Sequence, residues 1–142
     1  MVKSTLQLGL LVALGMALAC TTPTLAQPAS PLEDLRQTDL CLLRVGGFVA
    51  LTKAEHSPSS ADLSLLKEMY QVADRLIYRS EVLISQVGEP AQDGLIADLM
   101  PGWNQSLKHG DGEPNKAAIL RADLTPGLKA CIQSAKSLPN RP

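Results

Sequence analysis

The 142-residue sequence has few aromatic side chains and no excess of either charge. Its aromatic residues are Phe48, Tyr70, Tyr78 and Trp103, so a core must be built mainly from Leu, Ile, Val and Ala. This composition favours packed helices over a β-sandwich rich in aromatic and β-branched residues. The formal net charge is −1, whereas nucleic-acid-binding proteins carry a clear basic excess. We therefore expect no nucleic-acid partner.

The usual motifs of catalytic and cofactor sites are also missing. The chain contains no Gly-x-Ser-x-Gly, no phosphate-binding loop, no paired helix histidines and no haem-attachment Cys-x-x-Cys-His. His109, Asp111 and Glu113 are potential metal ligands in one loop, but they lack a calcium-loop pattern and a second histidine nearby. We therefore expect no catalytic residues, no cofactor and no metal site.

The N-terminal segment, residues 1–26, has the pattern of a secretory signal peptide. Lys3 provides a positive start, and the apolar run from Leu6 to Ala19 is too short to span a bilayer as a helix. Pro23 precedes a small-residue site that ends at Ala26. We predict removal of residues 1–26 and export of one domain, residues 27–142, to the periplasm or out of the cell.

The three cysteines support two predictions, one from Cys20 and one from Cys41 with Cys131. Ala17-Leu18-Ala19-Cys20 resembles a bacterial lipobox, so a lipoprotein anchored through Cys20 is the alternative to soluble export, and only that form would involve a membrane. Cys41 and Cys131 follow the leader, an even number in a compartment where disulfides persist. Because no Cys-x-x-Cys spacing suggests redox or zinc chemistry, we predict a structural disulfide between them.

The first helix is predicted from the segment Ser30–Glu33, which combines a capping serine, a proline at the first helical position and a glutamate that can close the capping box. This helix should run to about Ala54. Arg44 is its only charged residue from position 40 to position 52. A helix that is apolar on every side is normally surrounded by others, so we expect it to be central.

Gly46-Gly47 permits a second interpretation of this segment, a β-hairpin with a two-residue turn. The flanking apolar residues do not alternate with polar ones, which favours the helix. Two glycines inside a helix cost about 1 kcal/mol each relative to alanine. Close contact with a neighbouring helix is the expected compensation.

The second helix is predicted over residues 60–87, after a capping signal at Ser59 and before the terminating Gly88. Its apolar residues recur at helical spacing and are expected to form the buried face. The positions are Leu63, Leu66, Tyr70, Ala73, Ile77 and Ile84, widened by Met69, Val72, Leu76 and Leu83.

The remainder of the chain is less regular. We expect a short helix over 95–100 that stops at Pro101-Gly102, and a loop over 110–114. A helix capped by Asn115 should then run through Ala122, and Thr125-Pro126 should start a last helix. The predicted fold is an all-α bundle of three to five helices, clasped by one disulfide.

Five residues are candidates for recognition: Arg44, Arg75, Tyr78, Arg79 and Trp103. Arg44 needs a carboxylate partner or an anionic ligand, because a buried unpaired charge is costly. Tyrosine, tryptophan and arginine are enriched among interface hot spots. Each candidate also has a structural interpretation: an ion pair for Arg44, a solvated helix face for residues 75–79, and a plug at one end of the bundle for Trp103.

The sequence thus predicts an exported helical protein that acts by binding another extracytoplasmic protein, as an inhibitor, immunity factor, chaperone or accessory subunit. The alternative is a carrier with a small-ligand site between helices, near Arg44 and Gly46-Gly47. A pocket would favour the carrier, whereas a filled core with exposed aromatic side chains would favour the protein partner.

Overall fold

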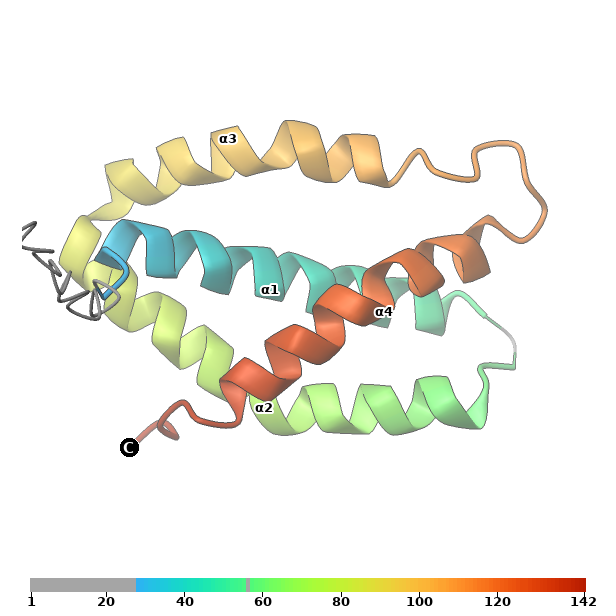
Figure 1. The fold of residues 1–142 in the computed structure, drawn as a ribbon, viewed down its shortest axis with the longest axis horizontal. Helices are drawn as coiled ribbons and strands as arrows, with labels where there is room; N and C mark the ends of the chain where they lie inside the picture. The colour runs from blue at the N-terminus through green and yellow to red at the C-terminus, as the bar shows by residue number, and fades with distance from the viewer. Residues whose placement is uncertain (1–27, 56) are drawn as a thin grey trace, which may run out of the picture.

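The computed structural model describes residues 28–142 apart from residue 56, and these residues form four helices (Figure 1). They are α1 (Pro31–Lys53), α2 (Ser60–Val87), α3 (Glu89–Ser106) and α4 (Lys116–Ala135). The helices alternate in direction, so α1 and α3 run the same way (Figure 1). No strand occurs in this part of the chain, which confirms the all-α prediction and rules out the hairpin at Gly46-Gly47. The predicted leader and Cys20 lie outside the described residues.

Local capping rules explain where the first two helices begin and end. The Ser30 hydroxyl accepts a hydrogen bond from the backbone N–H of Glu33 at 3.2 Å, and Ser59 caps α2 through the N–H of Asp62 at 3.1 Å. Gly88 separates α2 from α3 with a φ of +90°, a conformation that glycine adopts without a steric cost. These three predicted boundaries are confirmed.

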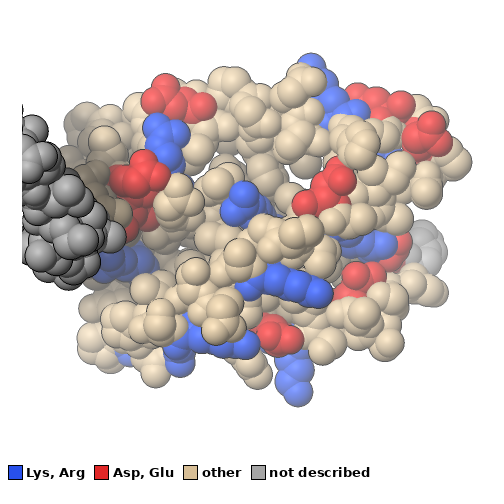
Figure 2. Space-filling view, viewed as in Figure 1, with Lys and Arg blue, Asp and Glu red and all other residues tan. Residues whose placement is uncertain are grey.

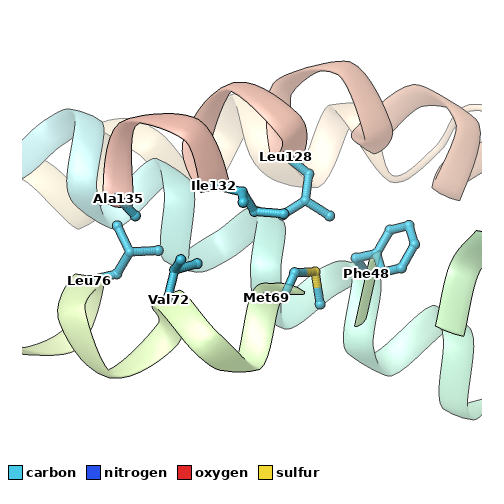
Figure 3. Packing of buried hydrophobic residues seen from close by; sticks show 7 residues of the cluster. All are labelled: Phe48, Met69, Val72, Leu76, Leu128, Ile132 and Ala135. Carbon is cyan, nitrogen blue, oxygen red and sulfur yellow. The ribbon is translucent and has the colours of Figure 1, made fainter. Parts of the chain in front are cut away.

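The main core joins α1, α2 and α4. In Figure 3, side chains from α4 point down onto side chains from α2, and Phe48 of α1 closes one end of the cluster. Its fully or nearly fully buried members are Phe48, Met69, Val72, Leu76, Leu128, Ile132 and Ala135. The Cys41–Cys131 disulfide links α1 to α4 beside this cluster, across 90 positions of sequence, as predicted.

A smaller cluster attaches α3 to the rest of the molecule. Leu95 of α3 packs with Leu35 of α1 and Leu83 of α2, and all three side chains are buried. Leu95 lies in the first half of α3. Helix α1 contacts all three other helices, as the sequence predicts for a central helix, and α2 also contacts each of the other three.

Two helix boundaries predicted from proline are wrong. Helix α3 continues through Pro101 to Ser106, and α4 continues through Pro126 as one helix. Proline inside a helix removes one backbone hydrogen bond and costs about 3 kcal/mol. Tertiary packing offsets that cost in α4, where Leu128 and Ile132 follow the proline and are buried in the main core.

The predicted buried face of α2 is also partly wrong. The buried positions are Met69, Val72, Leu76 and Leu83, which were expected only to widen the stripe, together with Ser80. Three positions expected in the core are instead exposed: Leu63 at 50%, Tyr70 at 58% and Ile77 at 44%. Helix α2 therefore has two apolar stripes, and contact with α1 and α4 decides which one is buried.

Candidate functional site

A long apolar groove separates α1 from α3. Its volume is about 580 Å³, and none of its lining residues belongs to α4. Figure 2 shows the surface hollowed below α3 on the face that α4 crosses. Eleven of the lining residues are apolar or glycine: Leu42, Leu43, Gly46, Gly47, Ala50, Leu51, Ile96, Leu99, Met100, Trp103 and Leu107. The other three are Asp39, Ser80 and Gln92.

Small residues on α1 help to keep this groove open. The position of a Cβ on Gly46 would have no neighbouring atom within 4 Å, because the glycine borders open space. A Cβ on Gly47 would lie 2.9 Å from the Trp103 ring. The expected close helix contact is therefore confirmed at Gly47 and not found at Gly46.

Trp103 forms the wall between two cavities. The half-buried indole lines the groove on one side and, on the other, a smaller cavity of about 260 Å³ that Arg44 also lines. Its ring lies across the backbone of Gly47 and thereby joins α3 to α1. Because Trp103 is the only tryptophan in the chain, its fluorescence would report directly on the groove.

The polar end of the groove is built around Asp39. This side chain is only 8% exposed, and its Oδ1 accepts a hydrogen bond from the Ser80 hydroxyl at 3.0 Å. Its Oδ2 is buried and has no hydrogen-bond partner among the described residues. A buried polar atom without a partner costs about 1–3 kcal/mol, and more when it is charged. Among the described residues, Asp39 is the only charged one that lines the groove.

The other carboxylates of α1 are more exposed and yet paired with arginine. Asp34 lies 2.9 Å from Arg79, and Glu33 lies 3.7 Å from Arg36. No cation lies within 4.0 Å of Asp39 in the part of the chain that the structure describes. Buried carboxylates are normally paired with a cation. On α1 the more exposed carboxylates are paired, whereas the buried Asp39 is not.

Arg44 lies on a different side of α1 and does not line this groove. Its guanidinium packs against Gly127, where a Cβ would be 2.8 Å from Nε, and Nη1 donates to Cys131 Sγ at 3.7 Å. Within the described residues no carboxylate lies within 4.0 Å of Arg44, so the expected ion pair is wrong. The guanidinium instead borders the disulfide and two cavities, of about 260 and 350 Å³.

The predicted recognition residues on α2 make contacts within the molecule. Arg75 donates to Asn140 Oδ1 and to the Lys136 carbonyl, both at 2.7 Å. The Arg141 guanidinium lies over the Tyr78 ring, 5.6 Å from its centroid. With Arg79 bound to Asp34, this side of α2 fastens α1 and the C-terminal tail. The structure therefore does not bring Arg44, Trp103 and the α2 residues into one site.

Two of the loop residues that were considered as metal ligands form ion pairs. His109 pairs with Asp123, and Asp111 pairs with Lys116, so these two loop residues fasten the start of α4.

The buried Arg121 binds Glu55 through both guanidinium nitrogens. This hydrogen bonding lowers the pKa of Glu55 and raises the pKa of Arg121. The pair joins the end of α1 to α4, and no pattern in the sequence predicted it.

Comparison of the chain with protein-family models, curated proteins and solved structures found no match. Among the described residues, no helix is long and apolar enough to cross a membrane. A functional conclusion must therefore come from the groove and the exposed surface themselves.

Proposed function

We propose that this protein, once exported, binds a small elongated and mostly apolar molecule in the groove between α1 and α3. The observation that carries the proposal is the groove itself, because its volume of about 580 Å³ falls within the range of roughly 300–1,000 Å³ typical of small-molecule sites. Such sites combine an apolar lining with a few polar groups. Asp39, Ser80 and Gln92 are the polar groups here.

The dimensions of the groove support a small molecule as occupant. Its wall on α1 extends from Asp39 to Leu51, which corresponds to about 18 Å along a helix axis. Its polar residues on α1 and α2, Asp39 and Ser80, are hydrogen-bonded to each other. An elongated ligand would place its polar end there and its apolar body along Gly46, Gly47 and Trp103.

The export included in the proposal has two supports. The Cys41–Cys131 disulfide is typical of an oxidising compartment outside the cytoplasm, and the predicted leader agrees with it. A carrier for poorly water-soluble molecules needs a site of this kind. The proposal corresponds to the alternative drawn from the sequence, with its site at Gly46-Gly47 and not at Arg44.

Nile red, an uncharged apolar fluorophore, tests this proposal. We expect saturable binding to the purified disulfide-bonded protein, with energy transfer from Trp103 to the dye. Gly46→Met should abolish binding, because Gly46 lines the groove and has room for a side chain that would fill it. Gly94→Met is the matched control, since Gly94 is also a helical glycine with open space around it but lies outside the groove. Absent or equally reduced binding in both variants would contradict the proposal.

Protein binding is the second candidate function, and the outer face of α2 favours it. Leu63, Tyr70 and Ile77 are exposed and follow one another every seven residues, the repeat that an amphipathic partner helix recognises. A photo-crosslinking residue at Tyr70 should capture a partner in the native compartment, whereas the same residue at the exposed Asn104 of α3 should not. Capture from neither position would exclude this candidate.

A further inference from the structure

The charge of the groove indicates which ligand it selects. We infer that its ligand is a long-chain amine, with a positively charged nitrogen at the Asp39 carboxylate and an apolar body that extends towards Trp103. This inference rests on the proposed small-molecule function and specifies the chemistry of the ligand.

The first observation is the state of Asp39. The residue is only 8% exposed, Ser80 Oγ is its only hydrogen-bond donor among the described residues, and Oδ2 has none. A carboxylate has acceptor sites for about four hydrogen bonds. Most of the acceptor capacity of this carboxylate is therefore unused. Oδ2 has almost no accessible surface, so the ammonium group of a ligand reaches it when the carboxylate turns towards the groove that Asp39 lines.

The second observation is the absence of a competing charge. Within the described part of the chain, no lysine, arginine or histidine lines the groove, and the nearest acidic neighbours on α1 have their own arginine partners. A cationic ligand would supply the partner that Asp39 lacks. An anionic ligand such as a fatty acid would instead place a second negative charge beside Asp39 in an apolar surrounding, which is strongly unfavourable.

The third observation is the order of the lining residues along the helices. Asp39 and Gln92 line one end, near the Leu35–Leu83–Leu95 cluster, whereas Leu51, Trp103 and Leu107 lie later on two helices that run in the same direction. The groove therefore has one acidic end and one apolar end. This polarity matches a linear amphiphile with a single terminal charge.

The test compares three ligands that share one alkyl chain: decylamine, decanol and decanoate. Each is used below its micelle concentration to displace Nile red from the purified disulfide-bonded protein. We expect decylamine to bind about tenfold more tightly than decanol, the gain expected for one charge-assisted hydrogen bond. Decanoate should bind most weakly. This comparison in the native protein does not depend on any variant folding correctly.

Asp39→Asn then removes the charge while its amide oxygen can still accept from Ser80. We expect the preference for decylamine over decanol to disappear, with decanol affinity unchanged. Asp98→Asn is the matched control, because Asp98 is an exposed carboxylate on α3 outside the groove. It should leave the preference intact.

The possible failures are distinguishable. If Nile red binds and Gly46→Met abolishes its binding, but decylamine shows no advantage or decanoate binds best, the inference about the amine is wrong and the proposed function stands. A preference for decylamine that survives Asp39→Asn also overturns the inference. Lack of Nile red binding contradicts the proposed function itself.

Discussion

The two sides of α1 differ in how they are packed. On one side, Phe48 and the residues around Cys41 meet α2 and α4 in a continuous core with buried side chains from all three helices. On the other side, the second half of α3 faces α1 across an open groove, and Ile96 remains 40% exposed. The same helix thus provides both the foundation of the fold and the wall of the candidate site.

The difference shows how a small helical protein can be stable and still keep a binding site. The closed side is crossed by the disulfide and holds seven of the twelve buried hydrophobic residues in the described part of the chain. The open side is held mainly at its ends, by Leu95 in one cluster and by Trp103 against Gly47. Stability and ligand binding are therefore carried by different faces of α1, and substitutions should separate them.

The largest expected effect is on the closed side, at the disulfide. Replacing Cys41 and Cys131 together by serine should lower the free energy of unfolding by about 4 kcal/mol, because a loop of 90 positions is released in the unfolded chain. Denaturant titration of the native and variant proteins measures this loss. The native protein should show no reactive thiol before reduction, and two reactive thiols would contradict the assignment.

The next prediction compares one residue from each side. Phe48→Ala should cost about 3–5 kcal/mol, because it leaves a cavity in the main core. Ile96→Ala should cost about 1 kcal/mol or less, since the side chain is partly exposed and borders a space that is already open. Denaturant midpoints measure both. Equal losses would mean that the groove side is as tightly packed as the core.

The adjacent glycines offer a finer comparison within α1. Gly47→Ala should destabilise the protein by about 1–2 kcal/mol, because the new methyl group meets the Trp103 ring, and it should shift the tryptophan emission. Gly46→Ala should instead stabilise the protein by about 0.5–1 kcal/mol, through the greater helix propensity of alanine. A destabilising Gly46→Ala would show that the groove closes on α1 in solution.

Local signals account for the parts of this fold that the sequence predicts well. Ser30, Ser59 and Gly88 act on their own helix ends, and the mostly apolar stretch around Arg44 marks the central helix wherever its neighbours lie. The disulfide follows from having two cysteines in the predicted exported domain. Each of these inferences depends on residues close in sequence or on a simple count.

The parts that could not be predicted depend on which helices meet. Helix α2 has two apolar stripes, and only its contacts with α1 and α4 decide that Met69 is buried and Tyr70 exposed. Pro101 carries a stop signal that packing overrides. The groove and the unpaired Asp39 follow from the spacing between α1 and α3, for which the sequence offers only Gly46-Gly47 as a hint.

The smallest predicted effect is a dependence on pH at the closed side, where Glu55 binds Arg121. Arg121 lowers the pKa of Glu55 in the folded protein, so the ionised carboxylate stabilises the fold. This stabilisation is complete above the pKa of Glu55 in the unfolded chain, which is about 4.3, and it is lost as the pH falls through the lower pKa of the folded state.

Glu55→Gln lacks the titrating group, so the difference in thermal midpoint between native protein and variant should be constant near neutral pH and shrink towards zero in acid. A difference that stays constant down to the most acidic measurement would show that the Glu55 carboxylate does not contribute through its charge. Binding of Nile red in the groove should be the same in both proteins at neutral pH, because neither residue of this ion pair lines the groove.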